Sequence, residues 1–318
     1  MKLAVKSSLN LLVILMFAFL LTACGSVEGK SKEIKIGYQK SAISLLLKNN
    51  KDFENELKEK GYTITWSEFN TGISIMEALS AGSVDFASAG DMPALFALAR
   101  GNDFRYIASQ PDSAATEGIV VRKDSDIESL EDLRGKKVAF NNASIAQYLT
   151  LKALEKGGLT MDDVKATHLE PSEANIAFEK GDVDVWVTWD PYMTVAENNG
   201  HTILQTAEGL VPYRSFHFSS AEMTEDYTEV VEIYVKYLNQ IGEEINEDPT
   251  EAAVLMEEVT KVPADVWKIA LKRSENDAQY IDDEAINDIN TQAQDLFDVG
   301  LIDEEINLES KIWQPESE

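Results

Sequence analysis

Short alternating apolar runs and amphipathic segments succeed one another from residue 33 to residue 192. Alternation of apolar and polar residues is typical of a half-buried strand, whereas apolar residues that recur every three or four positions are typical of a helix. The pattern predicts strands at 34–38, 63–66, 84–88, 138–140, 166–169 and 183–187, and helices at 43–57, 73–81, 93–100, 144–156 and 172–180. This alternation favours an α/β fold in which mostly parallel sheets are flanked by helices.

The pattern changes after Leu210. Residues 215–219 predict one strand that returns to the first lobe, and the remainder is acidic and helical. Helices are expected at 228–247, 250–260, 264–272 and 283–299. In the last of these the apolar positions recur at three- and four-residue spacing, which predicts one buried stripe.

Two stretches of the chain match at a constant offset of 99 residues. The matching positions are Ala78-Leu79, Gly82, Val84-Asp85 and Asp91 against Ala177-Phe178, Gly181, Val183-Asp184 and Asp190. We interpret them as equivalent parts of two lobes with one topology, with a chance match of a common helix–glycine–strand pattern as the alternative. Since open α/β sheets bind ligands beyond the carboxyl ends of their strands, facing lobes predict a cleft that closes by hinge motion.

The amino-acid composition excludes several classes of function. The 318 residues include 56 acidic and 28 basic side chains, a formal net charge of −28, and a single cysteine. That length is typical of about two domains. Nucleic-acid binding is excluded because it requires a basic surface. One cysteine excludes a disulfide framework and a multi-cysteine metal site.

The N-terminus has the order of a secretory signal. Lys2 and Lys6 precede an apolar run at 11–21, which ends in the small residues before Cys24. This order resembles the bacterial lipobox, which implies a signal peptide at 1–23, lipid on Cys24, a tether at 24–32 and anchoring on the extracytoplasmic face of the cell membrane. An ordinary signal peptide and an uncleaved anchor are the alternatives.

Catalytic motifs are absent from the sequence. It contains no His-Glu-x-x-His, P-loop or Gly-x-Ser-x-Gly pattern, and His168, His201 and His217 lack the spacing of metal ligands. We therefore expect no enzymatic activity, no cofactor and no metal site.

Binding chemistry has candidates where predicted strands give way to helices. Thr71-Gly72 and Asn142-Ala143-Ser144 lie at such points, where free N–H groups and the helix dipole suit an anion. Simple helix caps are the alternative for Thr71 and Ser144. Trp189 and Asp190 offer an apolar wall and an acceptor, or else a packed aromatic followed by a cap.

Several motifs together resemble the aliphatic sulfonate-binding proteins of ABC importers, which belong with the nitrate- and taurine-binding proteins. They are Ile36-Gly37-Tyr38-Gln39-Lys40, Trp66-x-Glu68-Phe69, Gly82-Ser83-Val84-Asp85, Gly90-Asp91-Met92-Pro93, Trp189-Asp190-Pro191-Tyr192 and Lys311-Ile312-Trp313-Gln314-Pro315. The resemblance implies a two-lobed type II periplasmic-binding fold with mixed sheets and a helical C-terminal extension on lobe 1. We expect lobe 1 at 33–121 and 214–318, and lobe 2 at 122–213.

The resemblance also implies a function. A monomer would capture a small aliphatic sulfonate outside the cell and deliver it to a membrane permease driven by an ATPase. Taurine, nitrate or a thiamine-pyrimidine precursor are alternative ligands, and an enzyme on this fold or a partner of a membrane receptor are alternative roles. The matching positions would place nine residues in the cleft: Gln39, Ser41, Thr71, Gly72, Gly90, Asp91, Ser144, Trp189 and Asp190. Asn142, at the second helix start, is a further candidate.

One departure from the family pattern concerns the second helix start. The family tends to have Lys-Gly-Ser-Ser there, whereas this chain has Asn142-Ala143-Ser144, with one hydroxyl and no glycine. Arg214 falls where the chain should recross the hinge, and a guanidinium suits an oxyanion. We hypothesise that Arg214 replaces the missing donors, with a pairing to surface acids as the alternative.

Overall fold

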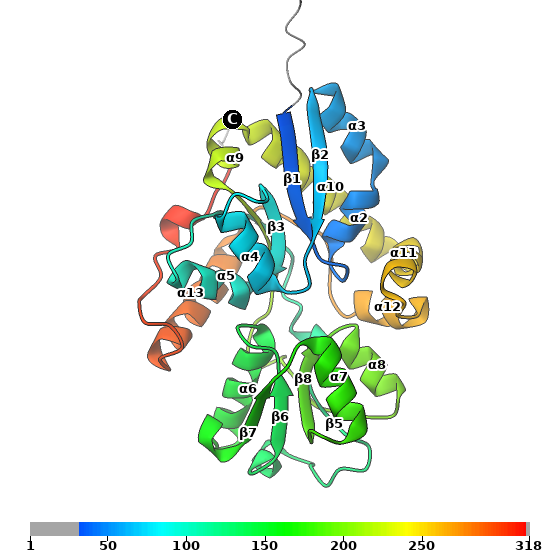
Figure 1. Cartoon of the computed structure of the whole chain (residues 1–318), viewed down its shortest axis with the longest axis vertical. Helices are drawn as coiled ribbons and strands as arrows, with labels where there is room; N and C mark the ends of the chain where they lie inside the picture. Colours follow the sequence, from blue (N-terminus) through cyan, green and yellow to red (C-terminus); the bar gives the residue numbers. More distant parts are fainter. Residues whose placement is uncertain (1–31, 316–318) are drawn as a thin grey trace, which may run out of the picture.

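A computed structural model describes residues 32–315, which form two lobes with a five-stranded sheet each (Figure 1). In the first lobe the strand order is β2-β1-β3-β10-β4, with β10 antiparallel to both of its neighbours. These strands are β1 (Lys32–Tyr38), β2 (Tyr62–Glu68), β3 (Phe86–Gly90), β4 (Arg105–Ser109) and β10 (Ser215–Ser219).

The second lobe repeats this arrangement with the order β7-β6-β8-β5-β9, in which β5 is antiparallel to β8 and β9. Its strands are β5 (Glu117–Val121), β6 (Lys137–Phe140), β7 (Lys165–His168), β8 (Val185–Trp189) and β9 (Thr202–Thr206). The expected mixed sheets are therefore confirmed. Because β5 lies in the second sheet, the expected end of the first lobe's opening segment at residue 121 is wrong, and the chain crosses before Glu117.

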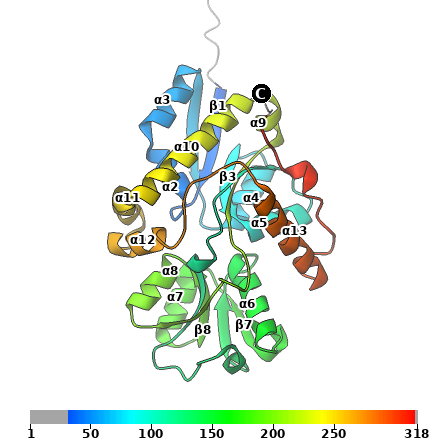
Figure 2. The same ribbon diagram turned by 180° about the vertical axis from the view of Figure 1, so that it is seen from behind.

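Helices cover both faces of each sheet (Figures 1 and 2). In the second lobe they are α6 (Ile145–Lys156), α7 (Pro171–Lys180) and α8 (Tyr192–Asn198). In the first lobe they are α2 (Ile43–Asn49), α3 (Lys51–Glu59), α4 (Gly72–Ser80), α5 (Asp91–Ala99), α9 (Ala221–Asp226), α10 (Thr228–Glu247), α11 (Thr250–Thr260), α12 (Ala264–Leu271) and α13 (Asp283–Asp298). Short 3₁₀ turns lie at Ala114–Thr116, Leu130–Leu133, Met161–Asp163 and Glu309–Lys311. None of the helices within residues 32–315 has the length and apolarity needed to cross a membrane.

The predicted helix at 43–57 is two helices. The chain breaks at Asn50, where the backbone is extended and the side chain accepts a hydrogen bond of 2.9 Å from the Phe53 amide. An asparagine oxygen can cap a new helix in this way, and its capacity for such local bonds disfavours the helix interior. The predicted helices at 228–247 and 250–260 are confirmed at both ends.

The internal repeat has a structural counterpart. In the first lobe the Asp85 carboxylate accepts from the Lys35 amide at 2.8 Å, while the Asp85 amide donates to the Lys35 carbonyl at 2.7 Å. Asp184 makes the same pair of bonds with Lys137 in the second lobe, at 2.8 and 2.9 Å. The aspartate of each Val-Asp pair thus bonds the turn before one strand to the neighbouring strand. This shared role explains why these positions match.

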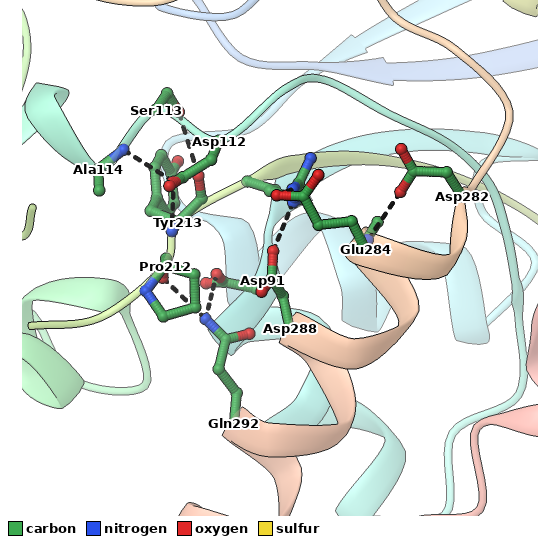
Figure 3. Close-up of polar contacts among 12 residues, drawn as sticks. Asp91, Asp112, Ser113, Ala114, Pro212, Tyr213, Asp282, Glu284, Asp288 and Gln292 are labelled. Carbon is green, nitrogen blue, oxygen red and sulfur yellow. Dashed lines mark hydrogen bonds and ion pairs between the residues drawn. The ribbon is translucent and has the colours of Figure 1, made fainter. Parts of the chain in front are cut away.

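The two segments that cross between the lobes are tied to each other (Figure 3). The Asp112 carboxylate accepts from the amides of Ala114 and Tyr213, both at 3.0 Å. The Ser113 amide donates to the Tyr213 carbonyl at 2.8 Å. These bonds join the segment that leaves the first lobe to the segment that returns to it. The hinge therefore consists of two short segments held side by side by hydrogen bonds.

The predicted signal peptide, Cys24 and almost all of the tether lie outside the described residues. Of the tether only Lys32 is described, and it is the first residue of β1.

Candidate functional site

A cavity of about 220 Å³ lies between the lobes. Its walls come from the carboxyl ends of strands and the starts of helices in both lobes, as the topology of open sheets requires. Eight of the sequence-predicted residues line it: Gln39, Ser41, Thr71, Gly72, Gly90, Ser144, Trp189 and Asp190. The structure therefore brings together residues from both expected strand-to-helix junctions.

The start of α4 forms one wall. Thr71 is its cap, and the side-chain oxygen accepts from the Ser74 amide over a long 3.4 Å. A Cβ on Gly72 would lie 2.5 Å from Cγ of Pro93, so a larger residue would push the helix start away from α5. With only one long capping bond, the first turn of α4 keeps N–H groups free for an anion.

The start of α6 forms the opposite wall, and it is built differently. The Ser144 hydroxyl donates to the Asn141 carbonyl at 2.7 Å, so its oxygen makes no side-chain cap bond. Ala143 has a φ of 51°, in the left-handed region that favours glycine. The Ala143 amide donates to Oε1 of Gln147 at 2.7 Å, which removes one donor from the cavity. The departure from the family pattern thus has a structural consequence.

Three predicted residues lie outside this lining. Asn142 is exposed, and its neighbour Asn141 lines the cavity instead. Asp91 is buried behind the wall. Arg214 points toward α13, where Nε lies 2.7 Å from Asp288 and Nη2 lies 3.0 Å from Glu284. Arg214 therefore takes the alternative of pairing with acids, and its guanidinium is not among the donors that line the cavity.

Asp91 has a structural role at the base of the hinge (Figure 3). Its carboxylate accepts from the Met92 amide and from the Gln292 side chain, both at 2.7 Å, and Gln292 also donates to the Pro212 carbonyl at 3.0 Å. Burial raises the pKa of Asp91 to about 7, against the opposing effect of these hydrogen bonds. Asp91 thus joins α5 to α13 and to the returning crossing.

Asp190 lines the cavity but already has partners. Oδ1 accepts from the amide and hydroxyl of Thr194 at 3.0 and 2.6 Å, while Oδ2 lies 3.0 Å from Nη1 of Arg273. Burial raises the pKa of Asp190, and the Thr194 bonds and Arg273 act in the opposite direction. Its charge is therefore compensated by the protein itself.

Glu117 is a cavity residue that the sequence interpretation missed. It is 1% exposed, its Oε2 has no hydrogen-bond partner, and Oε1 lies 3.5 Å from the Thr116 hydroxyl. Burial, reinforced by the charges of Asp190 and Asp91, raises the pKa of Glu117 well above its ordinary value. Burial therefore favours the neutral form of this carboxyl group, which faces the cavity. A lone glutamate at the start of a strand gives no signal in the sequence.

His217 and Ser88 are further missed residues that line the cavity. Both are buried in the middle of the first sheet, where β10 pairs with β3, and His217 Nδ1 lies 2.8 Å from Ser88 Oγ. Desolvation lowers the pKa of His217 to about 3, so the ring is neutral. The sequence places His217 in the predicted strand at 215–219 but cannot show that the first residues of this strand line the cavity.

Among the described residues, the cavity lining contains no lysine or arginine. Of its three carboxyl groups, Glu117 has its neutral form favoured by burial, Asp190 is paired with Arg273, and Glu275 is exposed. An anion there would meet hydroxyls, amides and helix N-termini instead of fixed positive charge. Within residues 32–315 no cluster of His, Cys, Asp and Glu side chains is arranged to hold a metal.

Comparisons with known proteins agree with this architecture. The family described as NMT1/THI5 like matches residues 57–252. The aliphatic sulfonates-binding protein of Escherichia coli (strain K12) is 30% identical over 91% of this chain and 91% of its own length. The corresponding protein of Bacillus subtilis (strain 168) is 31% identical over 95% of this chain and 94% of its own.

A solved structure is similar over the same span. The alkanesulfonate-binding protein of Xanthomonas axonopodis pv. citri, bound to MOPS, is 30% identical with a TM-score of 0.82. The likeness covers 90% of this chain and 100% of that one. Fold, family match and near full-length similarity agree, and the chain belongs to the NMT1/THI5-like family, on the branch of the aliphatic sulfonate-binding proteins.

Proposed function

We propose that the chain is the extracytoplasmic substrate-binding component of an ABC importer for small aliphatic sulfonates. A sulfonate would occupy the cavity between the lobes, and the lobes would present it to the permease. The observation that carries the proposal is the pair of helix starts, at Thr71 and Ser144, on opposite walls of one cavity. Such ends bind anions through N–H groups and need no basic side chain.

The proposal assigns a binding role instead of catalysis. Relatives that match nearly the whole chain are named as binding proteins. The chain's one cysteine, Cys24, lies outside the described residues and cannot belong to the described cavity lining. The low pKa of His217, about 3, makes the ring too weakly basic for an efficient general base.

Thermal unfolding with a ligand panel tests the proposal. The panel contains alkanesulfonates, taurine, sulfate, nitrate and thiamine precursors, in a buffer without a sulfonate group. A ligand at about 100 times its Kd should raise the unfolding free energy by about 2.7 kcal/mol. We expect alkanesulfonates to stabilise the protein. A response to nitrate or a thiamine precursor without any to sulfonates would overturn the sulfonate assignment and keep the importer role.

Two variants test the location. Ser144→Ala and Thr71→Val remove hydroxyls from opposite walls, and each should weaken sulfonate binding roughly fivefold, as expected for one hydrogen bond of about 1 kcal/mol. Ser220→Ala is the matched control, because Ser220 also precedes a helix without a side-chain cap bond but does not line the cavity. Equal losses in all three variants would argue against the assigned site.

We also propose that lipid on Cys24 holds the protein on the outer face of the cell membrane as a monomer. The order of basic, apolar and small residues before Cys24 supports this. Expression in a bacterial host with a labelled fatty acid should label the wild type and not Cys24→Ala. Label on both proteins, or on neither, would contradict the anchor. Size-exclusion chromatography with light scattering should give the mass of one chain.

A further inference from the structure

His217 ends a chain of hydrogen bonds that begins at a helix. Tyr234 of α10 is fully buried, and its hydroxyl lies 3.4 Å from Ser88 Oγ. Ser88 Oγ lies in turn 2.8 Å from Nδ1 of His217. The rings of His217 and Tyr234 pack edge to face, with centroids 6.3 Å apart. The imidazole is therefore held on the sheet face that α10 covers.

The relative donor strengths along this chain of bonds indicate which nitrogen carries the proton. A phenol is a better donor than an aliphatic hydroxyl and a poorer acceptor, so we assign the Tyr234 hydroxyl as donor to Ser88. We further assign the proton of the Ser88 hydroxyl to its bond with Nδ1 of His217. Since burial keeps the ring neutral, the remaining proton is on Nε2. Nε2 is thus a hydrogen-bond donor.

That donor has no partner within the described residues. Nε2 of His217 is buried and makes no hydrogen bond, although burying an unsatisfied polar group costs about 1–3 kcal/mol. Native structures seldom keep such a group without a reason. His217 belongs to the cavity lining, so a small movement of its neighbours on binding would let a ligand supply the missing acceptor.

The cavity lining also contains apolar side chains from three helices of the C-terminal half. Ile245, Met256, Trp267 and Leu271, from α10, α11 and α12, line the same cavity as His217 and Ser88. The first three are buried, and Leu271 is half-buried. These helices stand beside the gap between the lobes, next to α2 (Figures 1 and 2). The cavity therefore joins the helix starts to a part of the lining where these apolar side chains and His217 occur together.

We propose that His217 is a specificity-determining residue, and that the natural ligand is a sulfonate whose organic part carries an uncharged hydrogen-bond acceptor, such as a hydroxyl or ether oxygen, which binds Nε2–H. This inference rests on the proposed function, because it needs the sulfonate to be held at the helix starts. A site built around a hydrogen bond rejects an analogue that lacks the partner more strongly than an apolar pocket rejects an extra methylene.

Ligands of matched size test the inference. Isethionate, taurine and propanesulfonate differ only in a terminal hydroxyl, ammonium or methyl group, while MOPS and its piperidine analogue differ only in an ether oxygen or a methylene. Calorimetry on the wild type should give about tenfold tighter binding of at least one oxygen-bearing member than of its methyl or methylene partner. Taurine should gain nothing, since an ammonium cannot accept a hydrogen bond.

His217→Phe keeps a ring and removes the donor, so the preference for oxygen should disappear while methyl-ended sulfonates still bind. The matched control is His201→Phe. His201 is also buried beside a phenylalanine, Phe178, and also has an unpartnered ring nitrogen, Nδ1, but it does not line the cavity. The control should retain the full preference.

The outcomes separate this inference from the proposed function. Binding of sulfonates without an oxygen preference, or a preference that survives in His217→Phe, would overturn the role of His217 alone. No binding of any sulfonate to the wild type would overturn the proposed function and this inference together. Tighter binding of taurine than of isethionate would overturn the assigned acceptor.

A measurement on the wild type covers the case in which His217→Phe does not fold. Nitrogen NMR of the labelled histidines should show that Nε2 of His217 carries the proton, as the assigned hydrogen bonds from Tyr234 through Ser88 require. The Nε2–H resonance should shift, and its exchange with water should slow, with the preferred oxygen-bearing sulfonate and not with its methyl or methylene partner. A proton on Nδ1, or equal shifts with both ligands, would overturn the inference.

Discussion

Arg273 of the first lobe forms an ion pair with Asp190 of the second. Nη1 lies 3.0 Å from Oδ2 of Asp190, and Nη2 lies 2.6 Å from Glu197 at the end of α8. Arg273 follows α12, so the contact crosses the cavity mouth and is independent of the two hinge segments. Opening of the lobes would separate these groups. We infer that the pair stabilises the closed arrangement in which the cavity exists.

We expect Arg273→Gln to shift the protein toward open forms and to weaken sulfonate binding roughly fivefold to tenfold, because ligand affinity falls with the population of the binding-competent state. Kd measurements and small-angle scattering of the free protein check this. Arg105→Gln is the matched control, since Arg105 is as buried as Arg273 (19% and 18% side-chain exposure) but pairs with Asp103 inside one lobe. Unchanged affinity and unchanged dimensions in Arg273→Gln would refute the inference that this ion pair stabilises the closed arrangement.

Ala143→Gly should stabilise the protein by up to about 1 kcal/mol. A left-handed backbone costs a residue with a Cβ roughly 1–2 kcal/mol, and the greater freedom of glycine in the unfolded chain offsets part of that gain. Denaturant unfolding measures the effect. Ala81→Gly, at a right-handed position that ends α4, should instead lower stability. A loss of stability in both variants would contradict the strain assigned to Ala143.

The pH dependence of stability should contain a contribution from Asp91. Its folded pKa of about 7 lies above the ordinary value of 3.8, so the folded state holds a proton that the unfolded state releases. The free energy of unfolding therefore falls as pH rises from about 4 to about 7. In Asp91→Asn this fall should be smaller, as measured by denaturant unfolding at acid and neutral pH. Asp226→Asn, at an exposed position, should leave it unchanged.

Sulfonate affinity should decline in alkaline solution because of Glu117. Once ionised, its carboxylate would repel the anion, together with Asp190 and Asp91, while Tyr213 stays neutral because burial raises its pKa and Arg273 is engaged by Asp190. Glu117→Gln should bind sulfonates at neutral pH and lose the alkaline decline in a calorimetric titration. Glu275→Gln, at an exposed position in the same lining, should keep it. An equal decline in wild type and Glu117→Gln would exclude Glu117 as its cause.

The sequence predicted most of the fold because the parallel strands and their helices carry clear periodicity. It missed β4, β5 and β9, and two of these have an identifiable reason. Strand β5 begins with a buried glutamate, and β9 is only partly buried and has the sequence Thr-Ile-Leu-Gln-Thr, in which polar and apolar residues do not alternate. The strand predicted at 183–187 begins two residues too early, because Val183 and Asp184 lie in the turn before β8, which starts at Val185.

The candidate site was predictable only where it follows a general rule of α/β sheets. Thr71, Gly72 and Ser144 were found because helices begin there after strands. Glu117 and His217 depend on which strands lie beside each other, a tertiary property without local periodicity. Arg214 lies where the chain was predicted to return to the first lobe. Its partners come from α13, and one of them, Asp288, is 74 residues later in the chain.

The central place of β10 in the first sheet also constrains the order in which the polypeptide can fold as it is made. Strand β4 is joined to that sheet through β10 alone, whereas all strands of the second sheet lie between Glu117 and Thr206. The second sheet can therefore be complete before the last strand of the first has left the ribosome. Until Ser219 emerges, the first lobe remains a three-stranded fragment, so its completion is a late event in biogenesis.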